Sequence, residues 1–272
     1  MYTLRNDELR VEILDPLADQ ARFGVRYCTG GYIFQVHDAR RGPLLTGPTF
    51  PESFNWFDGQ GIPDAFNLSP QRAPGDASGR ALVLGIGLCD LAGRQVEEFC
   101  AWEVAEENSS ITMRTSHDVL GYSAALERTV SLNSRTLRSF TRLHNSGTLP
   151  IQMSWFPHPF FPQTDTPELC RLNLPLAAMP DNPGYMVNDS GWIARRAAPD
   201  QRGFYQALDL AEYGKLVILQ RHPALGLIAA TCSYAPTFFP IWGNQHTFSW
   251  EPFFERTLAP GQQVEWWIDY DF

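Results

Sequence analysis

The sequence lacks the long apolar runs of membrane proteins and secreted precursors. No stretch approaches the roughly 20 consecutive apolar residues that span a bilayer, and residues 1–8 contain no signal-peptide core. We therefore expect a cytoplasmic protein. An excess of basic residues is also missing, since 21 Lys and Arg against 30 Asp and Glu give a formal net charge of -9. This charge disfavours nucleic acid and anionic membranes as partners.

Paired cysteines and several catalytic signatures are absent as well. None of the five cysteines forms a CxxC pair, which argues against a zinc knuckle or a redox motif. Glycine-rich phosphate loops, the GxSxG nucleophile motif and the HExxH zinc motif are missing too. We interpret the dispersed cysteines as buried free thiols in a reducing compartment. They are Cys28, Cys89, Cys100, Cys170 and Cys232.

Strand-forming sequence is abundant. Aromatic residues make up 13% of the chain, and 21 Gly and 21 Pro separate short alternating runs. This pattern is typical of antiparallel sandwiches and barrels, so the expected fold class is all-β. All-β folds of this length often form one domain. Single strands are predicted at residues 9–14, 32–37, 82–88, 216–219, 225–231, 247–253 and 264–270. Residues 95–107 fit a helix or a strand, and this choice stays open.

Residues 126–156 predict three consecutive strands. Leu126, Arg128, Val130 and Leu132 share one face of the first strand. Turn signals at 133–135 and 145–148 separate it from strands at 137–143 and 151–156. The prediction is a β-meander that ends just before His158.

His158 lies between two prolines in an aromatic stretch, residues 155–162. Neither Pro157 nor Pro159 has a backbone N–H to donate to a sheet, so we expect irregular backbone at a strand end or bulge. The unperturbed imidazole pKa lies nearest to neutrality among side chains. His158 is therefore a candidate for proton transfer.

Glu251 is a second candidate for proton transfer. Strand parity places it on a polar face with Ser249, opposite Trp250, and Pro252 interrupts the strand beside it. Two interpretations stay open: a solvent-facing carboxylate, or a base at the floor of a polar cleft. Glu255, four residues further on, is a rival for the base.

Taken in order, several short motifs resemble those of the aldose 1-epimerases, or galactose mutarotase-like proteins. The motifs are HPFF at 158–161, EP at 251–252 and LAPGQQVEWW at 258–267, with GIP at 61–63 and WEV at 102–104. The resemblance covers nearly the whole chain at low identity. It implies a single galactose mutarotase-like domain over residues 1–272. It also implies a large antiparallel β-sandwich whose concave sheet forms a sugar cleft.

The resemblance also implies an activity. In this family the histidine and the glutamate of these motifs open the sugar ring, so His158 is implied as the general acid and Glu251 as the general base. The reaction requires no metal and no cofactor, and its partner is a small-molecule sugar. We expect the two side chains to face each other across a pocket, with room for a sugar ring between them. The sequence does not define the oligomeric state.

One family feature has no counterpart here. A histidine usually precedes the WEV strand, but residues 88–100 contain none, which leaves Asp90, Glu97 and His117 as candidate substitutes. This difference favours an alternative from another class, a non-catalytic carbohydrate-binding or sensing module.

The resemblance points to further sugar-binding residues. The arginine that follows GIP corresponds to Arg72 or Arg80, and the sugar-binding aspartate corresponds to Asp209. A phosphorylated hexose is a sub-variant that needs converging arginines, available at Arg72, Arg80, Arg171, Arg195 and Arg196. Aromatic rings suit the apolar face of a pyranose. The candidates are Trp56, Phe57, Trp155 and Trp242, and Trp242 is the best of them because the turn signal Gly243-Asn244 follows it.

Overall fold

The computed structural model describes residues 1–49, 59–75, 78–212 and 214–272. These ranges consist of antiparallel strands, loops and one 3-10 helix, η1 (Gln20–Arg22), without an α-helix. The all-β prediction is confirmed. In the part of the chain that is described, no helix is long and apolar enough to cross a membrane.

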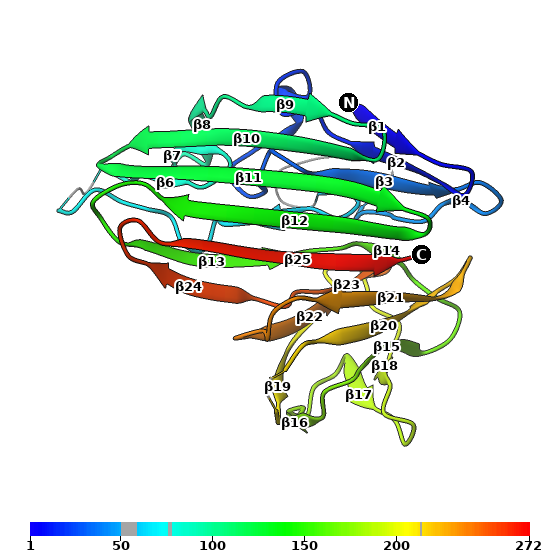
Figure 1. Ribbon diagram of the computed structural model, residues 1–272. Coiled ribbons are helices and arrows are strands. Elements are labelled where there is room, and N and C mark those ends of the chain that lie inside the picture. Colours follow the sequence, from blue (N-terminus) through cyan, green and yellow to red (C-terminus); the bar gives the residue numbers. More distant parts are fainter. Residues whose placement is uncertain (50–58, 76–77, 213) are drawn as a thin grey trace.

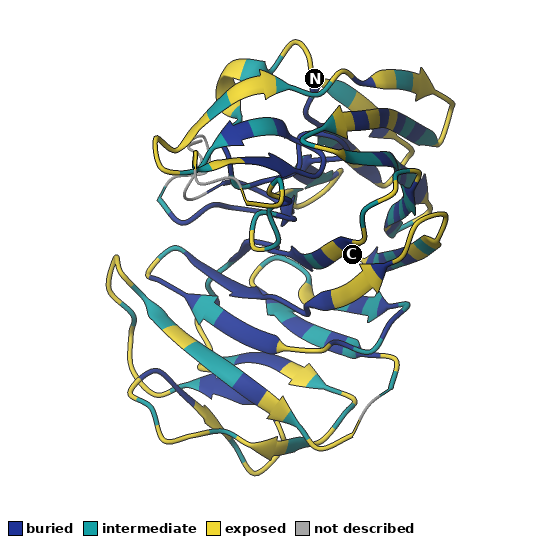
Figure 2. Cartoon of the chain, turned by 90° about the vertical axis from the view of Figure 1, so that its left-hand side faces the viewer, coloured by how far each residue is buried: buried dark blue, intermediate teal, exposed yellow. Residues whose placement is uncertain are grey.

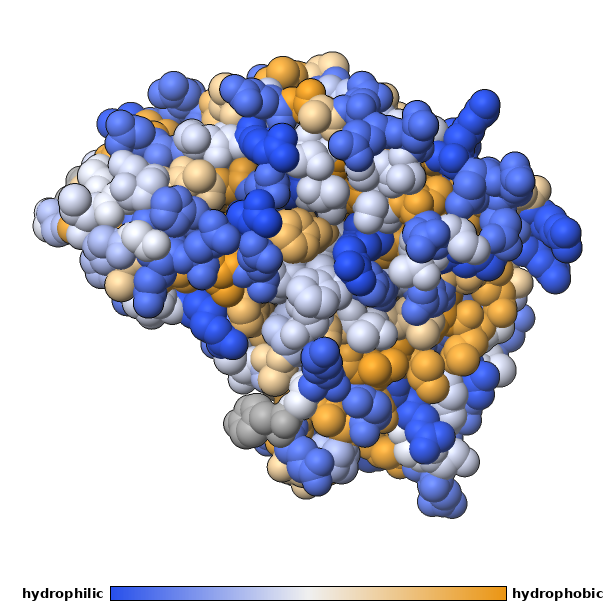
Figure 3. All heavy atoms as spheres, in the orientation of Figure 1, coloured by the Kyte–Doolittle hydropathy of each residue, from blue (hydrophilic) through white to orange (hydrophobic). Residues whose placement is uncertain are grey.

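A ten-stranded antiparallel sheet forms one face of the molecule (Figure 1). Burial alternates along its longest strands, so one face packs on the core and the other meets solvent. Figure 3 shows that this side of the molecule carries many hydrophilic residues in its upper part, with a group of hydrophobic ones lower down. In spatial order the strands are β17 (Tyr185–Val187), β18 (Ile193–Arg195), β15 (Glu168–Leu172), β20 (Val217–His222), β21 (Gly226–Cys232), β25 (Gln263–Asp271), β12 (Thr136–Asn145), β11 (Tyr122–Asn133), β10 (Ser110–Val119) and β9 (Glu103–Glu106).

Smaller sheets make up the rest of the structure, and two of them carry the candidate site. One has the order β14 (Phe161–Pro162), β23 (Thr247–Trp250), β22 (Phe239–Gly243), β19 (Phe204–Leu210) and β16 (Leu176–Ala178). The other has the order β24 (Phe254–Leu258), β13 (Ile151–Pro157) and β5 (Asp64–Ala65). The remaining strands are β1 (Tyr2–Arg5), β2 (Leu9–Ile13), β3 (Ile33–Asp38) and β4 (Gly42–Pro43) in one sheet, and β6 (Arg80–Val83), β7 (Gly87–Asp90) and β8 (Gln95–Phe99) in another. Figure 2 shows the buried and exposed residues that alternate along these strands.

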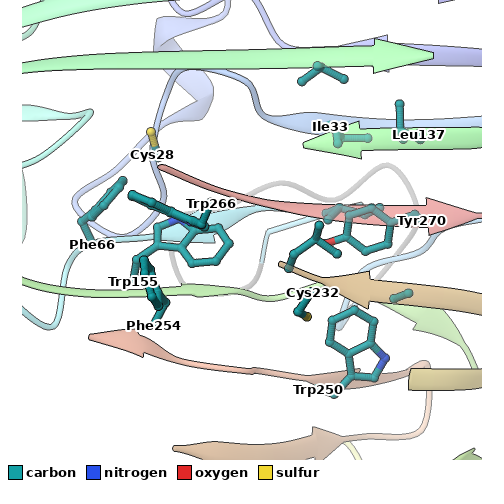
Figure 4. Close-up of a cluster of buried hydrophobic side chains, with 14 of the residues drawn as sticks. Cys28, Ile33, Phe66, Leu137, Trp155, Cys232, Trp250, Phe254, Trp266 and Tyr270 are labelled. Carbon is teal, nitrogen blue, oxygen red and sulfur yellow. The ribbon is translucent and has the colours of Figure 1, made fainter. Parts of the chain in front are cut away.

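Large aromatic side chains hold the site-bearing strands against the ten-stranded sheet (Figure 4). Trp155 of β13 meets Trp266 of β25 edge-on, with ring centroids 5.3 Å apart, and Phe254 of β24 lies 5.2 Å from the same indole. Trp250 of β23 stacks on Tyr270 of β25 at 6.1 Å. Rings of this size dominate core energetics. β25 therefore anchors both β13 and β23.

The predicted meander is wrong in its third strand. β11 and β12 pair as expected, but β12 pairs on its other side with β25, and β13 pairs with β24 in a different sheet. Asn145 explains this departure. Its side-chain amide donates to the carbonyls of Leu149 and Leu258, both at 2.9 Å, and its Oδ1 accepts from the Gly147 N–H at 3.0 Å. These bonds hold a turn that leads the chain out of the ten-stranded sheet.

Most other strand predictions are confirmed, at β2, β3, β20, β21, β23 and β25. The single strand predicted at 82–88 is wrong, because β6 and β7 form a hairpin there. Gly85 lies in its turn with φ +72, and a Cβ at this position would lie 2.3 Å from Cys28 Sγ. Residues 95–107 form β8 and β9, and not a helix. All five cysteines are free; four are buried and Cys100 is half-buried.

Candidate functional site

A cavity of about 340 Å³ lies where β19, β22 and β23 meet the segment between β13 and β14. Its volume falls within the range of small-molecule sites. Its lining combines three aromatic rings with one imidazole, one carboxyl group and one guanidinium. The lining residues are Arg26, Pro48, His158, Phe160, Tyr205, Trp242 and Glu251.

His158 directly follows β13, where the sheet ladder ends. Pro157 closes the strand opposite Asp64, and the His158 backbone N–H donates to the Pro63 carbonyl at 2.8 Å. The prediction of irregular backbone here is confirmed. The imidazole stacks on Phe160 with centroids 4.4 Å apart and meets Trp242 edge-on at 6.2 Å. It is only 4% exposed, so the surrounding rings fix its orientation.

Glu251 directly follows β23, and its backbone N–H donates to the Pro240 carbonyl at 2.9 Å. Trp250 faces the core, whereas Ser249 is paired with Trp242 in the adjacent strand. Glu251 is 8% exposed and lines the cavity. Of the two interpretations left open by strand parity, this geometry matches a carboxylate in a cleft.

The imidazole of His158 and the carboxyl group of Glu251 touch each other. The distance from Nε2 to Oε1 is 3.3 Å. The expectation of a gap wide enough for a sugar ring is therefore wrong. Both groups come from strand ends that meet at one wall of the cavity, and each is continuous with a strand that packs on β25.

Burial changes the protonation of both groups. Desolvation lowers the pKa of His158 well below its usual value, and the positive charge of Arg26 lowers it further. Desolvation raises the pKa of Glu251 to about 7, an effect that the same arginine partly offsets. At neutral pH the contact thus joins a neutral imidazole to a carboxyl group that is partly ionised.

Three predicted sugar-binding residues lie away from this cavity. Arg80 is exposed and pairs with Glu97, with Nη2 to Oε2 at 2.6 Å. Arg72 is exposed on a loop, and Asp209 is an exposed residue of β19. Trp242 is the member of this group that lines the cavity. The structure therefore brings together His158, Glu251 and Trp242, and it leaves the other three apart.

The candidate substitutes for the family's earlier histidine also lie elsewhere. His117 is buried, and its Nε2 accepts from the Gly85 N–H at 3.0 Å. The Asp90 carboxylate accepts from the N–H groups of Ala92 and Gly93 in a turn. Glu255, the rival base, accepts from the Ser154 hydroxyl at 3.1 Å and lies outside the cavity.

The aromatic candidates from the sequence also differ in whether they line the cavity. Trp155 is 2% exposed and belongs to the core, while Trp56 and Phe57 lie outside the described residues. Arg171, Arg195 and Arg196 do not line the cavity either. Within the described ranges, no group of three or more His, Cys, Asp or Glu residues is arranged to hold a metal ion.

Sequence reasoning missed Arg26, Pro48 and Tyr205. Tyr205 pairs with Trp242 across β19 and β22, so strand pairing is the signal that identifies it. Arg26 and Pro48 come from loops and carry no motif. Phe160 stands inside the HPFF motif, but its stacking on His158 follows only from the fold.

The comparisons with known proteins agree on the fold. No protein-family profile and no curated protein matches the chain. A galactose mutarotase related enzyme from Lactobacillus acidophilus aligns with 99% of this chain and 96% of its own, at a TM-score of 0.63 and 12% identity. An aldose epimerase homologue from C. elegans aligns with 98% of this chain and 97% of its own, at 0.53 and 12%.

A third solved structure shows that a similar fold also occurs as part of a larger protein. The 4-alpha-glucanotransferase from Thermococcus litoralis aligns with 99% of this chain but 37% of its own, at a TM-score of 0.50 and 11% identity. The chain thus has the galactose mutarotase-like β-sandwich fold. Because proteins with different activities share this fold, function has to be argued from the site.

Proposed function

We propose that this protein is an aldose 1-epimerase that interconverts the α and β anomers of a sugar. Glu251 is the general base and His158 the general acid. The observation that carries this proposal is the contact between His158 Nε2 and Glu251 Oε1, 3.3 Å apart, in the wall of the cavity. The fold shared with galactose mutarotase-like structures supports it.

The contact distance suits the reaction. Glu251 takes the proton of the C1 hydroxyl, the C1=O1 bond forms, the C1–O5 bond breaks, and O5 receives a proton from His158. Rotation about C1–C2 and the reverse steps give the other anomer. O1 and O5 are bonded to the same carbon, so an acid and a base that serve both oxygens lie close together.

The contact also allows Glu251 and His158 to regain their starting protonation states. Because a neutral imidazole is a very weak acid, the proton that Glu251 takes from O1 passes to Nε2 as the Nε2 proton passes to O5, so His158 stays neutral and Glu251 becomes a carboxylate again. A carboxyl group with a pKa of about 7 has the basicity that general catalysis at neutral pH favours. Phe160, Trp242 and Tyr205 supply aromatic walls for the C–H faces of a pyranose.

Anomer exchange followed by NMR tests this function. A panel of free and phosphorylated sugars is compared for the wild type, Glu251→Gln and His158→Asn. We expect acceleration for at least one sugar and a loss of about 100-fold or more in each variant. Glu255→Gln is the matched control, because it removes an exposed carboxylate four residues away and should keep full activity. Equal acceleration in all variants contradicts the proposal.

The second candidate is a non-catalytic carbohydrate-binding module. The lining of the cavity favours this candidate. Among the described residues that line the cavity, His158 is the one histidine, and the family's earlier histidine has no counterpart there. Sugar binding without acceleration of any sugar would support it. The phosphorylated sub-variant is decided by the same panel. Of the arginines in the described ranges, Arg26 lines the cavity, whereas the five arginines considered from the sequence do not.

A further inference from the structure

Ser249 extends the contact between His158 and Glu251 by one group. Its Oγ lies 2.7 Å from His158 Nδ1, on the side of the ring opposite Glu251. Ser249 is fully buried, and within the described ranges its hydroxyl has no other hydrogen-bond partner. A serine hydroxyl, an imidazole and a carboxyl group therefore form one connected row.

The direction of the Ser249 hydrogen bond follows from proton counting. A neutral imidazole carries one N–H, and the hydroxyl carries one O–H. If Nδ1–H donated to Oγ, the serine proton would be left without an acceptor in a buried site, which is costly. If the hydroxyl donates to Nδ1 instead, the serine proton has an acceptor, and the ring proton sits on Nε2, the nitrogen that lies 3.3 Å from Glu251 Oε1.

We propose that Ser249 is a positioning residue that holds His158 in the tautomer with its proton on Nε2. In this tautomer the imidazole presents a donor, and not a lone pair, to the place where Glu251 and the substrate oxygens meet. Its catalytic meaning rests on the proposed epimerase function. The tautomer itself is a property of the substrate-free protein and is testable without any sugar.

Removal of the Ser249 hydroxyl should release this constraint. The Nδ1–H tautomer then becomes accessible, and its Nε2 lone pair faces a carboxyl group that is partly ionised near neutral pH. The other groups that face the ring are Arg26 and Tyr205 in the cavity and Tyr27, whose ring centroid lies 6.4 Å away.

The direct test is the tautomer of His158 by long-range ¹H–¹⁵N NMR on the full-length labelled protein near neutral pH. We expect the wild type to show a pyridine-type Nδ1 and a pyrrole-type Nε2, Ser249→Ala to lose this pattern, and Ser249→Thr to keep it. Thr247→Val is the matched control. It removes a buried hydroxyl from the same face of β23, one that donates to the Phe161 carbonyl at 2.8 Å, and should leave the tautomer unchanged.

Kinetics add a second readout. Ser249→Ala should lower kcat by roughly 10- to 100-fold, by analogy with the groups that orient metal-bound histidines, with KM nearly unchanged, and Ser249→Thr should restore most of it. A wild-type spectrum with the proton on Nδ1 overturns the inference, even if no variant folds. An unchanged spectrum in Ser249→Ala overturns it as well. The expected tautomer without any epimerase activity contradicts the proposed function alone.

Discussion

His158 and Glu251 show how strongly burial decides the chemistry of single residues. Both are less than one-tenth exposed, and desolvation drives both toward their uncharged forms. For the histidine this means a lower pKa, and for the carboxyl group a higher one. Arg26 acts on both in the same direction, because a positive charge lowers the pKa of each. The pair is thus tuned by one shared cation.

The pH profile tests this tuning. Since the base must be ionised, we expect kcat/KM to fall as the pH drops through about 7, the pKa of Glu251. Arg26→Met should move this fall in kcat/KM to higher pH, because the charge that lowers the pKa of Glu251 is gone. Arg26→Lys keeps the charge and should largely preserve the pH profile. The measurement is NMR anomer exchange between about pH 4 and pH 9. A limb near the ordinary carboxyl pKa of 4.5 would contradict the assignment.

At this scale the sequence predicted the residues with local signals and missed the others. His158 stands between prolines, and strand parity placed Glu251 on one face with Ser249. The contact between them was not predictable, because it depends on how two strand ends meet. Arg26 and Tyr205 reach the cavity from a loop and from a separate strand, and no local pattern marks either one.

Among the elements, β5 is connected to the ten-stranded sheet by a buried ion pair. Arg128 of β11 donates from Nη1 to Asp64 Oδ1 at 2.8 Å, and its Nη2 bonds to Oδ2. Arg128 is 1% exposed. Asp64 pairs with Pro157, and the carbonyl of Pro63 holds the backbone of His158. The ion pair therefore supports the segment that carries the candidate acid.

Breaking this pair should be costly. We expect Asp64→Asn or Arg128→Met to lower the free energy of unfolding by about 3–5 kcal/mol, since each leaves a buried group without its partner. The double variant Asp64→Asn with Arg128→Met should cost less than the sum of the two single changes. The measurement is equilibrium unfolding in urea.

The exposed pair Arg80–Glu97 provides a matched control for this prediction. Arg80→Ala should cost about 0–1 kcal/mol, the usual value for an exposed ion pair. If the buried pair costs no more than this control, or if the double variant is fully additive, the supporting role of the pair is contradicted. Strand parity had placed Arg128 among apolar residues, but its partner, some 60 residues away, carries no sequence signal.

For the whole molecule, acid stability depends partly on His117, which lies far from the cavity lining. Burial lowers the pKa of this histidine to about 4 from 6.5. The unfolded chain therefore binds a proton on His117 at a higher pH than the folded protein does, and stability falls as the pH drops from about 6.5 to 4. The full effect is about 3 kcal/mol. Glu251 acts oppositely, because its raised pKa stabilises the folded state as the pH falls from about 7 to 4.5.

Because His117 and Glu251 change the stability in opposite directions, the contribution of His117 is measured as the difference in unfolding free energy between the wild type and a variant. We expect the free energy of unfolding of the wild type to decline relative to His117→Gln between pH 6.5 and 4, because glutamine does not titrate. His144→Gln, which changes a half-exposed histidine on β12, is the control and should parallel the wild type. Urea unfolding at several pH values gives the curves. A constant difference between wild type and His117→Gln would contradict the prediction.

At this scale the sequence predicted the fold class, because alternation and turn residues recur along the chain. It did not predict how the strands divide among sheets. The third strand of the expected meander, β13, does not pair with β12, because the chain turns out of the ten-stranded sheet at Asn145. The side chain of Asn145 bonds to Leu149 and to Leu258, and Leu258 belongs to β24, more than 100 residues later. Pairing of this kind is set by tertiary packing, and a local pattern does not encode it.

The central position of β25 has a consequence for protein synthesis. β12 lacks one of its two neighbours until residues 263–271 have been made, roughly 120 residues later, which takes on the order of ten seconds at ribosomal rates. An uncovered edge strand invites pairing with other chains, and charged side chains discourage it. Arg138 and Arg142 lie on β12, and Asp269 and Glu265, which pair with them in the finished sheet, arrive only with β25, although Arg142 also pairs with Glu127 of β11. Until then, these two arginines give the nascent chain a charged edge that resists aggregation.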